Sequence, residues 1–509
     1  MAALNDLLSS GEPVPRHAPW PRAIVSRSAW QQAAGRLQAG EWSLLALWGD
    51  AWGDSSGDRG FAHMAVLEAA TAQCAVLSVA RDGNRFPSVG RVHAPAIRLE
   101  RAMRDLLGLE PEGLEDSRPW LDHGRWGSAH PLGAAQGSRG RQYAFLPSEG
   151  HSLHQIPVGP VHAGIIEPGH FRFTANGETV VRLEERLGYV HKGTESLMAG
   201  ASLERGAVLA GRVSGDSTVA FSLAFSRAAE AALSVEPPPR AIWLRALLAE
   251  LERLANHFGD IGAVCNDAAF SIMHAQCGWL REQVLRVAES GFGHRLMMDR
   301  VVPGGTLCDL SPGAAKAVLG LVAEVRARFP ELVELYENTS SLKDRTVGTG
   351  VLSPALAQRF AAGGYVGRAS GRNFDARRTP GYAPYDSLRF EVPVVQAGDV
   401  NARVWIRIGE VQQSLDLVEQ IVAGLPAGPH RAELPSAGER EGIALVEGFR
   451  GDVLAWVRIG ADGRIQRCHL RDPSWFQWPL LEAAVEGNIV ADFPLCNKSF
   501  NCSYSGHDL

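Results

Sequence analysis

The sequence lacks paired cysteines. Its seven cysteines are scattered over 509 residues, and none of them is spaced Cys-x-x-Cys. Cys496 and Cys502 form the only close pair, with no third or fourth thiol nearby, so a thiolate metal site is not expected there. An odd number of scattered cysteines also argues against a disulfide framework and favours the reducing cytoplasm.

Long runs of charge and of apolar residues are absent as well. The net charge of −6 is spread along the chain without a polybasic or polyacidic stretch, which argues against nucleic acid as a partner. No uncharged apolar run reaches the roughly 18–20 residues that cross a bilayer, and the N-terminus lacks the pattern of a secretory signal. A dinucleotide site is not expected, since "GRASGRNFD" lacks the strand and helix that flank a G-x-G-x-x-G fingerprint.

Apolar patterning predicts an α+β protein in four parts. Residues 1–22 are expected to form an N-terminal tail, and residues 23–125 a small α+β domain of apolar strands and one helix. Residues 126–155 are rich in Gly, Ser and Pro, which is typical of a linker. Residues 156–509 are expected to form a large helical bundle decorated with β-hairpins, since "PPPRAIWLRALLAELERLANHF" carries a leucine stripe at helical spacing.

Two short turns, "RVSGDST" and "SYSGHDL", each carry two small residues three positions apart. The pairs are Ser214 with Ser217, and Ser503 with Gly506. Proteins usually present two soft ligands to one metal through such three-apart pairs, as in Cys-x-x-Cys. Here the pairs consist of hydroxyl groups and a glycine. The turns are therefore either an emptied metal site or two ordinary loops.

Several longer stretches resemble one known family. They are "GPVHAGIIEPGHFRF", "LGYVHKGTE", "LLAELERLANHFGDIGA", "GRASGRNFDAR" and "DVNARVWIRIGEV". In order and spacing they are similar to the large-subunit fold shared by [NiFe] hydrogenases and the quinone-site (49 kDa-type) subunit of respiratory complex I, over roughly residues 156–509. The first domain, through "FPSVGRVHAPAIRLERAMRDLLGLEPEG", resembles the 30 kDa-type subunit beside it. Both are fused in formate-hydrogenlyase- and hydrogenase-4-type large subunits.

The resemblance implies what the two turns have lost. Hydrogenases of this family hold nickel and iron with four thiolates, from an R-x-C-G-x-C turn and a C-terminal C-x-x-C. On that pattern the four ligand positions are the two pairs above, after Arg212, and hydroxyl groups are hard, weak ligands for nickel. We expect no NiFe centre and no other metal. The four positions, Arg212 and His507 would line a degenerate nickel or quinone pocket. The chain stops just after the motif, where nickel hydrogenases generally carry a cleaved extension.

The resemblance also implies candidate catalytic residues. Glu167 corresponds to a hydrogenase carboxylate that passes protons away from the metal, and Asp267 to the complex I aspartate that orients a quinone-binding histidine. That histidine has no single counterpart here, so His162 and His170 are both candidates. The quinone-binding tyrosine falls on Gly215. A purely structural role is the alternative for each of these side chains.

The charged residues Arg368 and Asp375 are expected to pair and to hold the loops around the cavity. The resemblance as a whole implies a subunit of a hetero-oligomeric, complex I-like redox complex, peripheral on the cytoplasmic face of the inner membrane. It would take electrons from a small [4Fe–4S] subunit toward a quinone-like or unknown acceptor, and membrane subunits of antiporter type would translocate ions. No cofactor is expected to bind tightly to this chain. The alternatives are an active [NiFe] hydrogenase large subunit and a catalytically silent scaffold.

Overall fold

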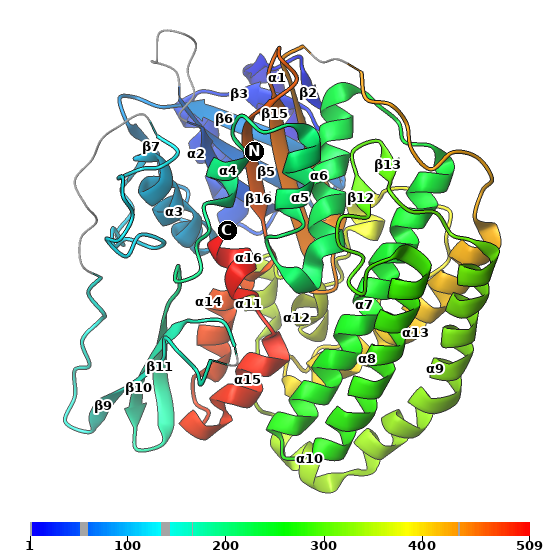
Figure 1. The fold of residues 1–509 in the computed structure, drawn as a ribbon. Helices are drawn as coiled ribbons and strands as arrows, with labels where there is room; N and C mark the ends of the chain where they lie inside the picture. The colour runs from blue at the N-terminus through cyan, green and yellow to red at the C-terminus, as the bar shows by residue number, and fades with distance from the viewer. Residues whose placement is uncertain (1–2, 51–59, 134–142, 165, 436–437) are drawn as a thin grey trace.

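A five-stranded sheet and its helices form the N-terminal part of the chain, in blue in Figure 1. The structure is a computed structural model that describes residues 3–50, 60–133, 143–164, 166–435 and 438–509. The elements here are α1 (Leu4–Ser10), β1 (Glu12–Pro13), β3 (Arg22–Ile24), α2 (Arg27–Gln38), β4 (Trp42–Asp50), β5 (Phe61–Glu68), β6 (Gln73–Ala80), β7 (Arg85–Pro87), α3 (Ile97–Leu107) and β8 (Glu110–Glu112). The strand order is β1-β3-β6-β5-β4.

Strand β4, "WSLLALWGD", is buried along its whole length. One side of its sheet packs on α2 and α3, and the other side meets a second sheet from the C-terminal part of the chain. A strand buried on both faces reads as a continuous apolar run, which is what the sequence has here. Helix α2 begins where the Ser26 hydroxyl accepts a hydrogen bond from the Ala29 N–H, an N-cap.

The segment that we expected to be an N-terminal tail contains regular structure. Leu4 and Leu7 of α1 are buried in the core of the first sheet. A short strand, β2 (His17–Ala18), pairs in parallel with a strand more than 400 residues later. The segment therefore connects the first sheet to a sheet from the C-terminal part of the chain. The expected linker is partly outside the described residues, at 134–142, and the rest of it ends in a strand that begins at Leu153.

A three-stranded antiparallel sheet opens the large domain, with order β11-β10-β9. It is followed by two short helices. These elements are β9 (Leu153–Val158), β10 (His170–Asn176), β11 (Thr179–Arg186), α4 (Thr194–Met198) and α5 (Leu203–Ala210). The loop between β9 and β10 carries the predicted proton carrier Glu167, so the sheet positions one edge of the candidate site.

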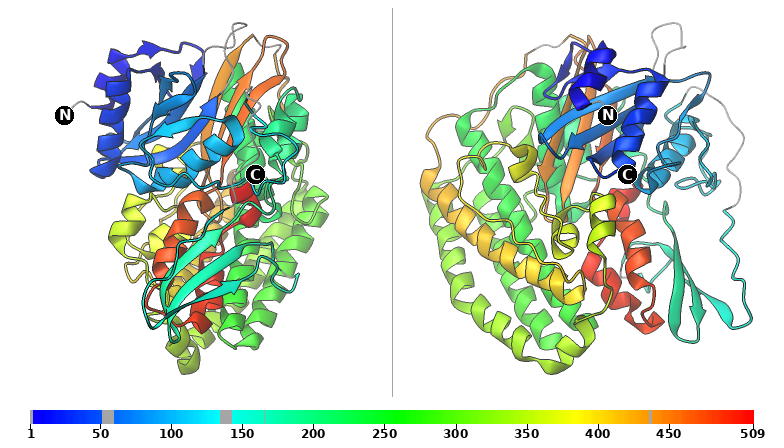
Figure 2. Two further views of the ribbon diagram at one scale, coloured as in Figure 1. Left: turned by 90° about the vertical axis from the view of Figure 1, so that its left-hand side faces the viewer. Right: turned by 180° about the vertical axis from the view of Figure 1, so that it is seen from behind.

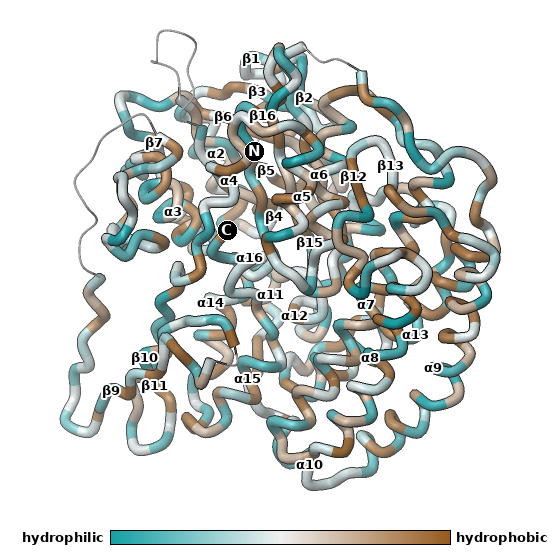
Figure 3. Tube along the Cα trace, in the orientation of Figure 1, coloured by the Kyte–Doolittle hydropathy of each residue, from teal (hydrophilic) through white to brown (hydrophobic). Residues whose placement is uncertain are grey.

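Long helices fill the centre of the molecule. They are α6 (Thr218–Leu233), α7 (Pro239–Asp267), α8 (Ser271–Phe292), α9 (Pro312–Asn338) and α13 (Val400–Gly424), with short α10 (Ser340–Thr346), α11 (Pro354–Arg359), α12 (Gly364–Ala369), β12 (Val301–Val302) and β13 (Gly305–Thr306). Hydrophobic and hydrophilic residues alternate along α8 and α9 in Figure 3, as expected of helices with one buried face. Helix α6 is buried on nearly all sides.

A second sheet, of order β16-β15-β14-β2, lies beside the first, as the rear view in Figure 2 shows in orange next to blue. Its strands and the C-terminal helices are β14 (Arg440–Glu447), β15 (Asp452–Ile459), β16 (Ile465–Arg471), α14 (Ser474–Val485), α15 (Phe493–Phe500) and α16 (Tyr504–Asp508). Helix α6 packs so closely on β14 that a Cβ on Gly442 would overlap the Ala228 carbonyl oxygen. Among the described residues, no helix has the length and apolarity to span a bilayer.

A buried ion cluster joins the two sheets. Glu441 on β14 pairs with Arg22 on β3, and its Oε1 lies 2.8 Å from Arg458 on β15. Burial raises the pKa of Glu441, but the two guanidinium groups outweigh burial and hold the pKa at about 2, below the ordinary 4.5. The ionised carboxylate is therefore what the folded state stabilises.

Replacing Glu441 by glutamine should lower the free energy of unfolding by roughly 3–5 kcal/mol at pH 7, because two buried arginines lose their shared counterion. The measurement is urea unfolding of the full chain, with exposed Glu439→Gln as the matched control. Since the folded-state pKa is depressed, this contribution is present above pH 4.5 and is lost as the pH falls toward 2. Equal stability of the two variants at pH 7 would contradict the assignment.

Candidate functional site

The two small-residue turns lie against each other. Ser214 precedes the 3-10 turn Gly215–Ser217, and Ser503 is the N-cap of α16. Their hydroxyl oxygens are 3.0 Å apart although 289 positions separate the residues, and each is 4% exposed. The positions that the sequence pattern paired therefore meet in one buried cluster.

An ion pair closes this cluster. One carboxylate oxygen of Asp216 accepts hydrogen bonds from Ser214, at 2.6 Å, and from Ser217, at 3.1 Å. The other lies 2.6 Å from Arg450, whose guanidinium also donates to Ser217 and to the Asn501 carbonyl oxygen. Burial raises the pKa of Asp216, but Arg450 outweighs burial and leaves that pKa below its ordinary value. Both turns are thus tied to one guanidinium–carboxylate pair, which we call the Arg450–Asp216 pair.

The fourth position, Gly506, faces a buried aspartate that our sequence reasoning did not single out. The Gly506 N–H donates to Ser503 Oγ at 2.9 Å, and a Cβ at this position would overlap Asp472 Oδ2. Asp472 is fully buried, and its Oδ1 accepts from the Ser474 N–H at 2.8 Å. Its Oδ2 has no hydrogen-bond partner among the described residues. Burial raises the pKa of Asp472. The only sequence signal for it is its place just after a buried strand.

The donor set does not fit a nickel–iron centre. The positions that would supply thiolates carry two hydroxyl groups bonded to each other, a third bonded to Arg450, and a glycine. A guanidinium within hydrogen-bond distance of a would-be ligand opposes a cation by charge. Among the described residues, no group of three or more His, Cys, Asp or Glu side chains could hold a metal ion. Nearby Cys502 is buried, which raises its pKa well above the ordinary value.

Arg212 does not join the cluster. Its side chain is exposed and makes a two-pronged ion pair with Asp299, at 2.8 and 2.7 Å. The resemblance implied a place for it in the pocket, because an arginine precedes the first thiolate in the hydrogenase turn. In the structure this guanidinium is engaged with Asp299, and Arg450, from the turn between β14 and β15, supplies the positive charge of the cluster.

Glu167 reaches the second turn from the β9–β10 loop. Its carboxylate accepts a hydrogen bond from the Ser505 N–H at 3.1 Å, in the first turn of α16, where N–H groups lack helical partners. The carboxylate also raises the pKa of Lys192, which burial lowers more strongly. Lys192 in turn donates to the Val213 carbonyl oxygen at 2.8 Å, next to Ser214. Glu167 is thus an exposed acid at the edge of the cluster.

The two candidate histidines hold the loop and do not face the cluster. His162 Nε2 lies 2.8 Å from the Gly169 carbonyl oxygen, and the ring packs on Phe171. His170 is buried at the start of β10, where it hydrogen-bonds to Arg172. Burial lowers the pKa of His170, which favours its neutral form. These contacts are the ones expected if His162 and His170 have a purely structural role.

Asp267 is also placed away from the cluster. It is the last residue of α7, where burial raises its pKa and Lys498 lowers it less. Seven residues earlier, or roughly 10 Å along the helix axis, Asp260 accepts from Asn501 at 2.9 Å and pairs with Arg407 at 3.1 Å. Asp260 therefore contacts the C-terminal segment that leads to Ser503, and the role of Asp267 in orienting a quinone-binding histidine stays a prediction.

His507 and Asp508 anchor the end of the chain. His507 is fully buried, stacks on Trp475 with ring centres 4.0 Å apart, and accepts a hydrogen bond from Trp120 at 3.1 Å. Asp508 accepts from the N–H groups of Gly188 and Val190. His507 therefore joins the N-terminal domain to α16, and its side chain packs on these two indoles.

Arg368 and Asp375 lie 3.6 Å apart, inside a larger buried network. The nearer partners of Arg368 are Glu410, at 2.6 Å, and Glu447, at 2.9 Å. The nearer partner of Asp375 is Arg377, at 2.7 Å. Both predicted residues are at most 2% exposed and hold the loop 368–377 against α13 and β14.

The same network extends to helix α7. His257 lies 2.7 Å from Glu410, and Arg377 lies 2.9 Å from Glu250. Burial raises the pKa of Glu410, but Arg368 and then His257 outweigh burial and hold it well below the ordinary value. Because each buried charge in the network has a partner of opposite sign, these interactions offset the desolvation cost of burying the charges. It fixes the helices behind the cluster.

Known proteins match both halves of the chain. Residues 267–441 match the family described as "Respiratory-chain NADH dehydrogenase, 49 Kd subunit", and residues 23–141 match the corresponding "30 Kd subunit" family. Formate hydrogenlyase subunit 5 of Escherichia coli is 31% identical over 92% of this chain and 85% of its own length. Hydrogenase-4 component G of the same organism is 32% identical over 84% of this chain and 76% of its own length.

A solved structure agrees with these matches. A chain of the membrane-bound sulfane sulfur reductase, an archaeal respiratory membrane complex, superposes with a TM-score of 0.67 at 25% identity and covers 70% of this chain and 99% of its own. The fold and the relatives define a subunit of an oxidoreductase complex. The chain belongs to the family of complex I 49 kDa-type subunits and membrane-bound hydrogenase large subunits, with a complex I 30 kDa-type domain at its N-terminal side. The resemblance found in the sequence is confirmed.

Gly506→Ala should destabilise the protein by about 1–3 kcal/mol, because its Cβ meets the Asp472 carboxylate in a packed site. Gly215→Ala, in the same cluster, has no heavy atom within 4 Å of the new Cβ and should be nearly neutral. Thermal unfolding of the two variants measures the difference. Adding Asp472→Ala to Gly506→Ala should recover part of the loss, and a fully additive double variant would contradict the contact.

Proposed function

We propose that this chain is a nickel-free electron-transfer subunit of a complex I-like membrane redox complex. The observation that carries the proposal is the Arg450–Asp216 pair, which stands with the serine hydroxyls at the positions that hold nickel in hydrogenases. The names of the relatives include both a quinone oxidoreductase and a hydrogenase. One is a subunit of the NADH-quinone oxidoreductase of Desulfotalea psychrophila, and another is hydrogenase-4 component G. The absence of the four thiolates favours electron transfer to a quinone-like acceptor over hydrogen chemistry.

Electrons would come from a small [4Fe–4S] partner subunit and would leave to a quinone-like acceptor near the two turns. Reducing a quinone to a quinol consumes two protons with two electrons, so the acceptor needs acids nearby. Glu167 is the carboxylate at the edge of the cluster. Tyr504 supplies a phenol beside the same loop, since a Cβ on Gly169 would lie 2.7 Å from its Cε1 atom. Glu167 and Tyr504 support an acceptor site between the β9–β10 loop and α16.

The chain would dock, as a peripheral subunit on the cytoplasmic face, onto membrane subunits of antiporter type. Relatives named as parts of membrane complexes support this docking: "Membrane-bound hydrogenase subunit alpha" of Pyrococcus furiosus is 30% identical over 68% of this chain. Proton uptake at the acceptor site would then be relayed to ion translocation in the membrane arm.

The complex purified with this chain should hold substoichiometric nickel and should neither produce nor consume H₂, because hydroxyl groups and a guanidinium do not retain the metal. Elemental analysis by mass spectrometry measures the nickel, and an [NiFe] hydrogenase carried through the same purification is the control. One nickel per chain together with hydrogen turnover would establish the hydrogenase alternative instead.

Glu167→Gln should slow electron transfer to the acceptor by roughly 10²-fold, since it removes the acid at the site edge while the side-chain shape and the acceptor oxygen for Ser505 remain. Glu178→Gln, on the exposed turn after β10, is the matched control. Turnover is compared at equal subunit content of the purified complex. Wild-type turnover in Glu167→Gln with normal assembly would favour the scaffold alternative.

A further inference from the structure

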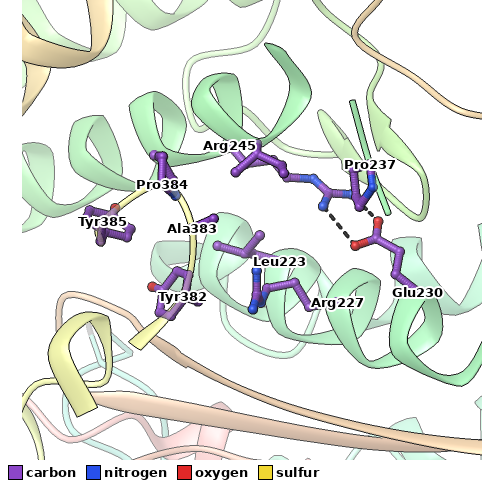
Figure 4. A pocket seen from close by; sticks show the side chains of 11 residues that line it. Leu223, Arg227, Glu230, Pro237, Arg245, Tyr382, Ala383, Pro384 and Tyr385 are labelled. Carbon is purple, nitrogen blue, oxygen red and sulfur yellow. Dashed lines mark hydrogen bonds and ion pairs between the residues drawn. The ribbon is translucent and has the colours of Figure 1, made fainter. Parts of the chain in front are cut away.

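A cleft lies between the C-terminal half of α6, strand β14 and the segment around Trp20. Its volume is about 610 Å³, within the roughly 300–1,000 Å³ typical of small-molecule sites. An inner recess of about 40 Å³ continues between α6, α7 and residues 382–385, as Figure 4 shows. Arg227, which lines both spaces, is ten residues beyond Ser217, or on the order of 15 Å along α6.

The guanidinium of Arg227 makes no ion pair or hydrogen bond in the described part of the chain, although Glu230 lies near enough to raise its pKa against the larger effect of burial. It lies over the ring of Tyr382, 4.7 Å from the centroid, and its Nε atom is buried without a hydrogen-bond partner. The nearby carboxylate of Glu230 is already engaged by Arg245 and by the Gly304 N–H, at 2.7 Å. The dashed lines in Figure 4 join Glu230 to Arg245 and leave Arg227 unbonded.

Other buried guanidinium groups in this molecule have polar partners, which are carboxylates for some of them and backbone carbonyl oxygens for others, such as Arg186 and Arg403. Arg245 pairs with Glu230, and Arg368 and Arg377 pair within the charge network. An unpaired buried charge costs several kcal/mol, so proteins normally supply a counterion. Burial lowers the pKa of Arg227, which reflects this cost. Arg227 has neither a carboxylate nor a carbonyl oxygen as hydrogen-bond partner among the described residues, so its guanidinium is available to a ligand carboxylate.

The surroundings restrict what that counterion can be. The cleft walls are mostly apolar, with Trp20, Val235, Ile242 and Leu445 among them. Glu230 and exposed Glu236 also line the cleft, so a second negative charge on the ligand would be repelled. A cleft with one guanidinium group and apolar walls is complementary to a ligand that carries one carboxylate and is otherwise apolar.

We propose that this cleft is a binding site for a small organic monocarboxylate, whose carboxylate pairs with Arg227 while its apolar part lies against Trp20 and Ile242. Such a site goes beyond the proposed electron transfer. It uses the far end of α6 and none of the residues of the cluster. A bound carboxylate would bridge the N-terminal segment and the helical bundle.

The test is equilibrium dialysis of radiolabelled benzoate against the full chain. We expect one saturable site, no competition by the neutral isostere benzamide, and at least a roughly 10-fold weaker affinity in Arg227→Met, which loses the charge-assisted hydrogen bonds. Arg205→Met, at an exposed arginine of α5, should bind as the wild type does.

A second variant keeps the test decisive if Arg227→Met does not fold. Ala231→Trp fills the rim of the cleft and leaves Arg227 in place, so it should also abolish benzoate binding. The absence of saturable binding to the wild type, equal competition by benzamide, or unchanged affinity in Ala231→Trp would each overturn the site. None of these outcomes bears on electron transfer at the two turns.

Discussion

The Arg450–Asp216 pair is the interaction on which the candidate site depends. It places a fixed positive charge between two turns that come together from distant parts of the chain. The hydroxyl groups of Ser214 and Ser217 use Asp216 as their acceptor, so both have a hydrogen-bond partner within the cluster. A buried cation of this kind occupies the electrostatic role that a metal would otherwise have. The turns can therefore close without nickel.

The rest of the large domain holds this pair in place. Behind it, the network centred on Glu410 ties α7, α13 and the loop 368–377 together through buried charges. In front of it, Asp508 fastens the end of α16 to the chain after β11, and His507 packs on two tryptophans. Since a buried charge without a partner is costly, these networks favour one arrangement of the helices. The geometry of the two turns follows from that rigidity.

Periodicity and motif order predicted most of this architecture. The leucine stripe predicted α7, and the unbroken apolar runs predicted the strands of the first sheet. The resemblance to the hydrogenase ligand pattern implied that Ser214 and Ser503 share one pocket, and in the structure their hydroxyl groups meet. Sequence reasoning missed contacts made across long separations: α1 and β2, which contact distant strands, and Asp472, whose neighbour Gly506 follows 34 residues later. It also did not single out Asp260, because counting residues does not fix which turn of a helix meets the C-terminal segment.

The central claim is that hydroxyl groups, a carboxylate and a guanidinium fill the place of the metal. Anomalous X-ray diffraction at the nickel edge, from crystals of the full chain or its complex, tests it most directly. The account predicts no anomalous peak between the two turns, with Ser214 and Ser503 in hydrogen-bond contact and Arg450 on Asp216. An ordered nickel peak there, with Arg450 displaced from the cluster, would contradict it.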